Sequence, residues 1–203
     1  YAGRHVVQLP NFSPEAWIDL CRKHQITTAF VVPTMLARIV EVLENESTAD
    51  LPHLQNLSYG GGKMPLSVIE KAMDLFPGTN FSNAYGLTET SAASFCNRPT
   101  QFKFGTVGLP LPGVEVRLAE PDNEILLRGR GIMRGYLGLP DATQETISDD
   151  GWLRTGDIGT IDTDKFLRIV DRKKDLIKTS GGKYIAPQKL EGKLKATCPF
   201  ISQ

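Results

Sequence analysis

The stretch NLSYGGGKMPLSVIEKAMDLFPGTNFSNAYGLTET, residues 56–90, decides the fold of this 203-residue chain. It opens with a short apolar run, residues 56–59, that predicts a strand and leads into three consecutive glycines. Apolar residues at helical spacing follow from Leu66 to Phe76, and a Pro-Gly pair ends that helix. A second strand is predicted over residues 80–84. A strand, a helix and a strand in succession are typical of a parallel sheet with a crossover helix.

The residues before this stretch continue the same alternation. Residues 5–9 and 27–32 predict two further strands, and Ser13 can cap a helix between them. Apolar residues from Met35 to Leu43 predict another helix. We therefore expect an α/β layer over residues 1–104, with ligand-binding loops at the carboxyl edge of its parallel sheet.

The pattern changes after about residue 105. Short strands separated by Gly and Pro predict a small β subdomain over residues 105–170. Beyond it, a basic, glycine-containing segment precedes a helix start at Pro187. We interpret residues 171–203 as a hinge near Asp171 and the truncated start of a C-terminal α+β domain. The predicted strands of the subdomain are 114–118, 124–128, 153, 158–161 and 166–170.

Charge and cysteine content exclude several classes of protein. The 23 basic and 23 acidic residues balance, so we expect no nucleic-acid partner. Cys21, Cys96 and Cys198 show neither a CxxC pair nor zinc-ligand spacing, which favours a reduced compartment. No apolar run approaches the roughly 20 residues needed to span a bilayer, and no signal peptide is visible. We expect a cytoplasmic protein, with peripheral contact with a membrane left open.

Two motifs follow predicted strands of the sheet. Gly60-Gly61-Gly62-Lys63 lets the backbone approach a flat ligand or a phosphate, or forms only a tight turn. In the segment 85–90, Tyr85 can stack on a base, Thr88 can bond a phosphate oxygen, and Glu89 can hold Mg²⁺ beside that phosphate. The alternative for this segment is a polar turn with a capped helix start.

Two further motifs lie in the second half of the chain. Asp157, flanked by Gly156 and Gly159, can take both hydroxyls of a ribose from a tight turn, or merely support a β-turn. The basic run 172–174, with Lys178, can meet phosphates or form a solvated surface. Neither a GxSxG elbow nor an HExxH pattern occurs, so hydrolase functions lack a nucleophile or a metal site.

Taken in order, these motifs resemble those of the adenylate-forming superfamily, which includes acyl-CoA synthetases, firefly luciferase and peptide-synthetase adenylation domains. The resemblance covers essentially the whole chain and is nearest to fatty acyl-CoA ligases. It implies an internal segment of such an enzyme, without the upstream phosphate loop and the lysine near the C-terminus. The matching stretches are residues 59–65, 83–90, 124–129 with 135–136, 151–157 and 171–178.

The resemblance also implies roles for individual residues. Tyr85 would stack on adenine, Gly61 to Lys63 would line the adenine and acyl pocket, Thr88 would meet the α-phosphate, and Glu89 would bind Mg²⁺. We assign Gly60, Asn83, Gly86 and Leu87, from the same motifs, to the nucleotide site as well.

The later motifs complete the implied site. Asp157 and Arg172 would hold the ribose hydroxyls, and Asp171 would be the hinge of the C-terminal domain. Lys178, with Gly181 and Gly182, would face the pantetheine tunnel and act in thioester formation.

The implied reaction is the ATP-dependent activation of a carboxylic acid as acyl-AMP, followed by transfer to coenzyme A with release of AMP. The co-substrates would be ATP with Mg²⁺ and CoA, and the acid is expected to be a fatty acid. We expect residues 1–203 alone to be inactive in adenylation. The alternatives are a carrier-protein-loading adenylation domain, an acyl-AMP ligase or an inactive nucleotide-binding segment, and a homodimer through a sheet edge stays open.

Overall fold

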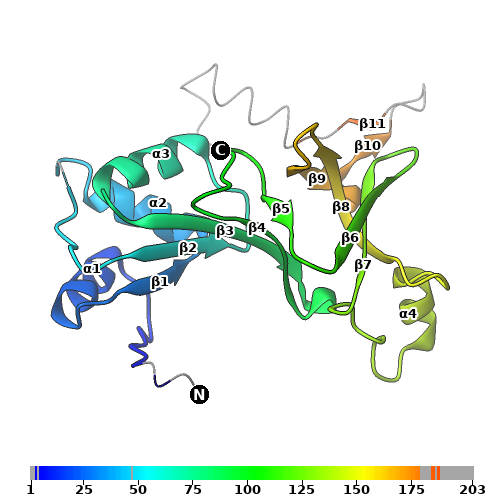
Figure 1. Cartoon of the computed structure of the whole chain (residues 1–203), viewed down its shortest axis with the longest axis horizontal. Coiled ribbons are helices and arrows are strands. Elements are labelled where there is room, and N and C mark those ends of the chain that lie inside the picture. Colours follow the sequence, from blue (N-terminus) through cyan, green and yellow to red (C-terminus); the bar gives the residue numbers. More distant parts are fainter. Residues whose placement is uncertain (1–2, 4, 47, 179–183, 186, 188–203) are drawn as a thin grey trace. The chain divides into compact units, whose positions relative to one another are not determined.

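A computed structural model describes residues 3, 5–46, 48–178, 184–185 and 187 of the chain. The chain divides into two compact units (Figure 1). Unit 1 contains Tyr1–Tyr85 and Asn97–Gly105, and unit 2 contains Gly86–Cys96 and Thr106–Gln203. Each unit is described in turn.

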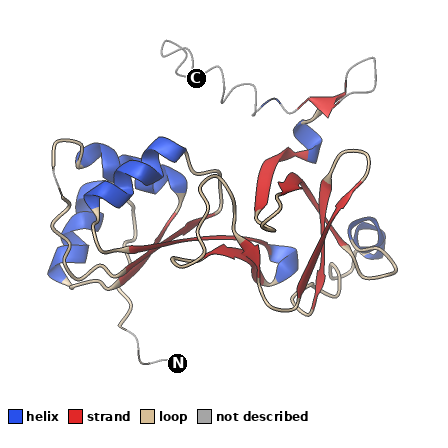
Figure 2. Cartoon of the chain, turned by 45° about the horizontal axis from the view of Figure 1, so that its top comes forward, coloured by secondary structure: helices blue, strands red, loops and turns tan. Residues whose placement is uncertain are grey.

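Unit 1 alternates helices and parallel strands, which confirms the predicted α/β pattern. β2 pairs in parallel with β1 on one side and β3 on the other. α2 packs against both α1 and α3, and these three helices form the group of blue ribbons on the left of Figure 2. The elements are α1 (Pro14–Lys23), β1 (Thr28–Val31), α2 (Pro33–Val42), β2 (Asn56–Gly60), α3 (Leu66–Leu75) and β3 (Asn80–Leu87).

The first helix begins where the sequence predicted. The Ser13 side chain accepts a hydrogen bond from the N–H of Ala16 at 3.1 Å, and Pro14 occupies the first turn. The predicted strand over residues 5–9 is wrong, because these residues form neither helix nor strand. Val6 is 80% exposed, so its apolar side chain gains none of the burial that stabilises a strand in a sheet.

The core of unit 1 follows the two-residue period of the strands. Leu57 pairs with Ala29 and Phe81, and all three contribute to one apolar cluster with the helices. The intervening positions point to the opposite face, where the hydroxyls of Ser58 and Ser82 lie 2.7 Å apart. Helix and strand periodicity therefore converge on one buried layer, which explains why the sequence pattern was sufficient to predict it.

Unit 2 is dominated by a four-stranded antiparallel sheet in the order β6-β7-β8-β9. The sequence predicted this β-rich texture but divided β8 into two pieces and missed α4 and β4. Gly156 interrupts the apolar alternation of β8, which explains the division. The elements are η1 (Thr88–Thr90), β4 (Ala92–Asn97), β5 (Leu109–Pro110), β6 (Val114–Ala119), β7 (Glu124–Gly129), α4 (Pro140–Thr146), β8 (Leu153–Ile161), β9 (Leu167–Arg172), η2 (Lys173–Asp175), β10 (Ile177–Lys178) and β11 (Tyr184–Ile185).

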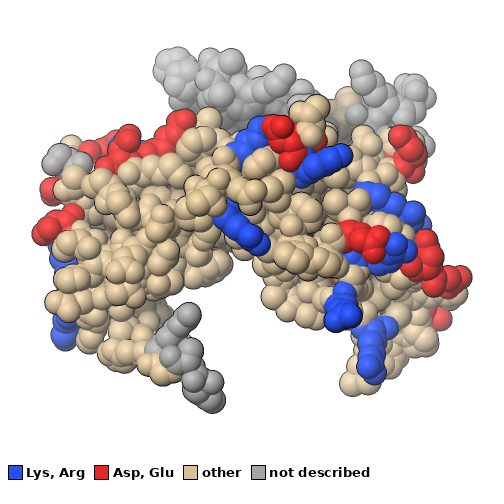
Figure 3. Space-filling view, in the orientation of Figure 1, with Lys and Arg blue, Asp and Glu red and all other residues tan. Residues whose placement is uncertain are grey.

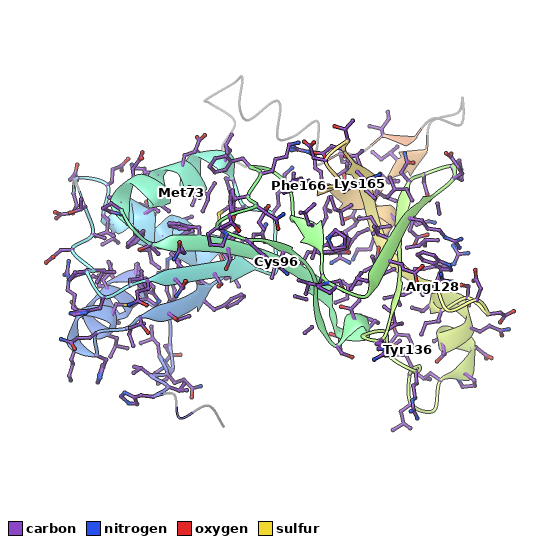
Figure 4. The ribbon with its side chains drawn as sticks, viewed as in Figure 1. Met73, Cys96, Arg128, Tyr136, Lys165 and Phe166 are labelled. Carbon is purple, nitrogen blue, oxygen red and sulfur yellow. The ribbon has the colours of Figure 1, made fainter. Side chains whose placement is uncertain are left out.

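Apolar packing in unit 2 centres on a few fully buried side chains, among them Ile125, Leu127 and Leu153. Two guanidinium groups lie over the Trp152 ring, with Arg117 4.3 Å and Arg128 4.7 Å from its centroid. Figure 4 labels Arg128 in this region. Unit 2 also buries several carboxylates, which have no counterpart among the described residues of unit 1.

The predicted boundaries at residues 104/105 and 170/171 stay predictions, as does the hinge. Asp171 lies in β9, pairs with Ile158 and is buried. The helix start expected from Pro187 onward lies almost entirely outside the described residues, as do Gly181, Gly182 and Cys198. Within the described part of the chain, no helix is long and apolar enough to cross a membrane.

Candidate nucleotide site

The glycine triplet lies at the carboxyl end of β2 in unit 1. A side chain at Gly60 would place its Cβ 2.9 Å from the carbonyl oxygen of Ala84, and Gly61 has a left-handed φ of +80°. Gly62 is different, because a Cβ there would only make ordinary contacts with Pro33 at 3.7 Å. The backbone therefore requires the first two glycines, whereas Gly62 and the exposed Lys63 are open to a ligand role.

Asn83 and Tyr85 lie in β3, at the end of unit 1. Asn83 is half-buried and pairs with Tyr59 of β2. Tyr85 is only 8% exposed, so most of its ring is already covered by protein. The adenine-stacking role of Tyr85 stays a prediction.

The chain enters unit 2 at Gly86. A side chain at Gly86 would overlap the carbonyl oxygen of Ala92, so close backbone packing alone requires glycine there. The next residues form a single 3₁₀ turn, η1, which agrees with the polar turn of the alternative but does not continue into an α-helix. The Thr90 hydroxyl accepts a hydrogen bond from the Leu87 N–H at 2.9 Å and lies 2.6 Å from the Ala92 carbonyl oxygen. This buried hydroxyl fixes the turn that carries Thr88 and Glu89.

Glu89 is held by contacts from the loop between β7 and α4. Its carboxylate oxygen Oε1 accepts a hydrogen bond from the Tyr136 hydroxyl at 2.7 Å, and its carbonyl oxygen accepts one from the Met133 N–H at 2.8 Å. The hydrogen bond to Glu89 raises the pKa of the Tyr136 phenol, since the phenol serves as the donor. Tyr136 is itself fixed through its N–H, which donates to the Thr143 hydroxyl of α4 at 2.9 Å. One carboxylate oxygen of Glu89 is thus oriented by protein.

Asp157 lies inside β8 and not in the tight turn that the sequence analysis expected. It pairs across the sheet with Arg172 of β9, whose Nε lies 2.9 Å from Asp157 Oδ1. The flanking glycines have structural reasons: Gly156 has a left-handed φ of +69°, and a Cβ at Gly159 would lie 2.7 Å from the Ile125 side chain. The sequence therefore predicted the proximity of Asp157 and Arg172 correctly and the local backbone wrongly.

A second charged group adjoins this pair and was missed by the sequence analysis. Lys173 Nζ lies 2.9 Å from Asp122 Oδ2 and 2.8 Å from Glu124 Oε2. Both carboxylates are buried, so the lysine neutralises charge that water cannot reach freely. The basic run 172–174 is consequently not only a solvated surface, because its first two residues form ion pairs. Figure 3 shows how side chains of opposite charge lie beside one another on unit 2.

The pKa directions agree with this pairing. Burial by itself would raise the pKa of the Asp122 carboxyl, but hydrogen bonds from Lys173 and from the Glu124 N–H, with the lysine charge, hold it below its usual value. Burial would lower the pKa of Lys173, but hydrogen bonds to Glu124 and Asp122, with their charges, raise it. Asp122 and Lys173 are therefore both charged near neutral pH.

A pocket of about 420 Å³ in unit 2 brings several of these residues together. Its lining residues include Leu87, Glu89 and Tyr136, together with Arg172 and Lys173. Glu124, Arg154 and Gly156 also line it. The pocket therefore combines three carboxylates (Glu89, Glu124 and Glu145) with three cations (Arg154, Arg172 and Lys173), a polar lining that suits a polar ligand with phosphate groups.

The donor set fits a magnesium ion that arrives with phosphates. Among the residues that the structure describes, no three His, Cys, Asp or Glu side chains gather into a metal-binding group. Mg²⁺ commonly uses one or two carboxylates together with waters and substrate phosphates. Glu89, with one oxygen bonded to Tyr136 and the other outside that bond, fits such partial ligation.

Lys178 lies in β10, where its backbone pairs with Tyr184 of β11. The structure does not describe its side chain, so its role in thioester formation stays a prediction.

Comparisons with known proteins agree with the motifs. The AMP-binding enzyme family matches residues 1–137. The 4-coumarate-CoA ligase 3 of Oryza sativa subsp. japonica is 34% identical over 208 residues, covering 95% of this chain and 37% of the relative. A candidate fatty-acid-CoA ligase of Mycobacterium tuberculosis (strain CDC 1551 / Oshkosh), fadD11, is 42% identical over 124 residues, covering 61% of this chain and 22% of the relative. The chain thus spans well under half the length of these relatives.

A solved structure shows the same fold. The O-succinylbenzoate coenzyme A synthetase of Bacillus subtilis, in complex with ATP and a magnesium ion, matches 92% of this chain and 40% of its own with a TM-score of 0.76 and 31% identity. The fold class and the family resemblance predicted from the sequence are therefore confirmed. The chain belongs to the AMP-binding enzyme family, whose CoA-ligase members include the relatives it matches.

Proposed function

We propose that this chain supplies the nucleotide-binding part of an ATP-dependent acyl-CoA ligase, which activates a carboxylic acid as acyl-AMP and transfers the acyl group to coenzyme A. The observation that carries the proposal is the pocket of unit 2, which Glu89 and Arg172 line together, with Arg172 bound to Asp157. Family membership supports the reaction class, since the relatives are CoA ligases.

The ribose is bound at the Asp157–Arg172 pair in this proposal. A carboxylate with two acceptor oxygens can receive both hydroxyls of a ribose, and its burial strengthens those hydrogen bonds. Arg172 Nε lies 2.9 Å from Asp157 Oδ1 and orients the carboxylate. The Arg172 side chain is half exposed and lines the pocket, so a ligand there can reach the arginine of the pair.

The phosphates are met at η1. Thr88 is exposed and can donate its hydroxyl to an α-phosphate oxygen. Glu89, oriented by Tyr136, would ligate Mg²⁺, which stabilises the charge that develops as the carboxylate attacks the α-phosphate. The residues of this chain therefore bind and orient the nucleotide, and the acid and ATP supply the atoms that react.

The remaining assignments rest on the family motifs. Tyr85 contacts adenine together with Gly60, Gly61, Asn83 and the backbone from Gly86 to Leu87. Gly62 and Lys63 line the adenine and acyl pocket. Lys178 acts in the thioester step, with coenzyme A as the second co-substrate. Each assignment can be tested separately by mutation.

The acyl group is proposed at a coarser level. The relatives include enzymes named for 4-coumarate and one named for fatty acids, so a carboxylic acid of either the aryl or the fatty class fits. The names of these relatives favour coenzyme A over a carrier protein as the acceptor.

Calorimetric titration with a stable acyl-AMP analogue and Mg²⁺ tests the proposal. Asp157→Asn preserves the shape of the side chain but removes its charge, and we expect binding to weaken about tenfold, which corresponds to roughly 1.4 kcal/mol. Asp149→Asn, an exposed aspartate of unit 2 outside this pocket, serves as the control and should bind like the unaltered chain. Unchanged affinity in a folded Asp157→Asn variant would contradict the assigned ribose site.

A further inference from the structure

Glu124 is a buried carboxylate that none of the sequence motifs assigned to the ligand. It lies in β7, with its side chain only 4% exposed. Oε1 accepts a hydrogen bond from the Gly156 N–H at 3.1 Å, and Oε2 accepts one from Lys173 Nζ at 2.8 Å. Arg154 adds a weaker contact, with its guanidinium 3.5 Å from Oε2. Both carboxylate oxygens of Glu124 therefore accept hydrogen bonds, one from β8 and the other from the residue that follows β9.

These contacts bracket the Asp157–Arg172 pair. Gly156 immediately precedes Asp157 in β8, and Lys173 immediately follows Arg172 at the end of β9. Asp157 and Arg172 are themselves cross-strand partners. Glu124 thus links Gly156, the residue before Asp157, to Lys173, the residue after Arg172.

The backbone next to Asp157 has unusual freedom that such a tie would limit. Gly156 has a φ of +69°, which glycine adopts readily and other residues avoid. The β8–β9 register shifts between Ile158 and Gly159, so the regular ladder is interrupted on the other side of Asp157. A fixed acceptor for the Gly156 N–H therefore restrains the point where β8 is least constrained by its own sheet.

The neighbouring acid does not duplicate this arrangement. Asp122 Oδ2 contacts Lys173 at 2.9 Å, whereas its Oδ1 accepts the Glu124 N–H at 3.1 Å. Asp122 therefore supports Glu124 and the lysine, but the bond to the Gly156 N–H comes from Glu124.

We propose that Glu124 is a positioning residue for ribose recognition, which holds Asp157 and Arg172 in the geometry that takes the two ribose hydroxyls. This inference rests on the proposed function, because it assumes that the pair binds ribose. Glu124 acts through Gly156 and Lys173 and does not itself touch the ribose.

The test compares AMP with 2′,3′-dideoxy-AMP, which lacks both ribose hydroxyls. The unaltered chain should bind AMP at least about tenfold more tightly than the dideoxy compound. Glu124→Gln keeps an acceptor of the same shape but loses the charge that holds Lys173. We expect it to weaken AMP binding about fivefold and to leave dideoxy-AMP within about twofold, so the preference shrinks.

Glu115→Gln is the matched control. Glu115 of β6 forms a two-point pair with Arg128 in the same sheet, with Oε1 3.1 Å from Nε, and neither residue lines the pocket. Its substitution should leave the preference for AMP unchanged.

Each other outcome contradicts a distinct claim. Equal weakening of both nucleotides by Glu124→Gln would indicate a merely structural role and overturn the inference, as would an undiminished preference. Absence of any preference in the unaltered chain would contradict the proposed ribose site itself. If Glu124→Gln does not fold, Glu124→Asp, which keeps the charge on a shorter side chain, must show the same selective loss for AMP.

Discussion

Two lysine–glutamate pairs, one in each unit, have the same 2.8 Å separation and very different surroundings. In unit 1, Lys71 meets Glu44, whose side chain is 63% exposed. In unit 2, Lys173 meets Glu124, whose side chain is 4% exposed and which also binds backbone. Water competes for the first pair and scarcely for the glutamate of the second, so equal distances represent unequal energies.

The difference extends to the units as a whole. Unit 1 buries a continuous apolar cluster, and its described ion pair lies at the surface. Among the residues that the structure describes, the buried carboxylates Asp122, Glu124, Asp157 and Asp171 all belong to unit 2. Burying a carboxylate is costly unless charges and hydrogen bonds offset it. The charged interior of unit 2 is therefore where a functional site is expected, and unit 1 is organised chiefly by apolar packing.

We expect the largest effect from a comparison of two glycines, one that the backbone requires and one that is assigned to the ligand. Gly86→Ala places a methyl group against the Ala92 carbonyl oxygen, and we expect a loss of about 3 kcal/mol in the free energy of unfolding. Gly62→Ala has only ordinary contacts at 3.7 Å and should change that free energy by less than about 0.5 kcal/mol. Urea unfolding followed by circular dichroism measures both.

The same two variants also test the ligand assignment. Gly62→Ala should weaken binding of the acyl-AMP analogue although it leaves stability intact, because the added methyl group occupies space assigned to the ligand. Normal binding by Gly62→Ala would leave the triplet a structural turn, and normal stability of Gly86→Ala would contradict the close backbone packing at that residue.

The two lysines provide the next comparison. Lys173→Met leaves two buried carboxylates without their cation, and we expect a loss of about 2 kcal/mol in the free energy of unfolding, moderated by the partial exposure of the lysine. Lys71→Met removes an exposed pair and should lose less than about 1 kcal/mol. Trp152 fluorescence in a Trp17→Phe background reports the unfolding of unit 2 for Lys173→Met, and Trp17 fluorescence in a Trp152→Phe background reports that of unit 1 for Lys71→Met. Equal losses in the two variants would show that burial does not distinguish the pairs.

Unfolding at low pH should reveal a smaller effect of the contact between Lys173 and Asp122. The folded-state pKa of Asp122 lies below its ordinary value of 3.8, so its contribution to stability is present above that pH and is lost as the pH falls through the folded pKa. As the pH falls from 5 to about 2, the unaltered chain should lose about 1 kcal/mol more of its free energy of unfolding than Lys173→Met does. Urea unfolding at several pH values measures this loss. An identical acid profile in the variant would show that Lys173 does not lower the pKa of Asp122.

The contribution of Lys173 to stability has the opposite pH dependence, because it is lost at high pH. Its folded-state pKa lies above the ordinary value of 10.5, so its contribution is present below that pH and decreases as the pH rises through the folded pKa. The ion pair should therefore stabilise unit 2 evenly across the neutral range.

The sequence predicted unit 1 well because burial there follows a simple period. Leu57 and Phe81 alternate with Ser58 and Ser82 along the strands, and residues such as Ile39 and Ile69 recur on helices. The error at residues 5–9 came from the same rule, since an apolar run resembles a strand whether or not it pairs. Strand pairing depends on residues far away in the sequence, which a local pattern does not contain.

Unit 2 shows where local patterns become insufficient. The motifs identified Glu89, Asp157 and Arg172, and the structure brings Asp157 and Arg172 into contact. The turn predicted at Asp157 was wrong, because its flanking glycines serve a left-handed backbone and the packing of Ile125. The partner of Glu89 was also not predicted, since Tyr136 lies 47 residues further along the chain.

The sequence by itself determined the α/β alternation and the family, and it predicted which residues bind a nucleotide. Periodicity and short motifs depend on residues that are near one another in the sequence, so they can be recognised without a structure. Only the tertiary structure decided that Glu124 and Asp122 face Lys173, that Tyr136 orients Glu89, and which glycines the backbone itself requires. These are matters of distance and burial between remote segments, and the free energy of a buried charge depends on both.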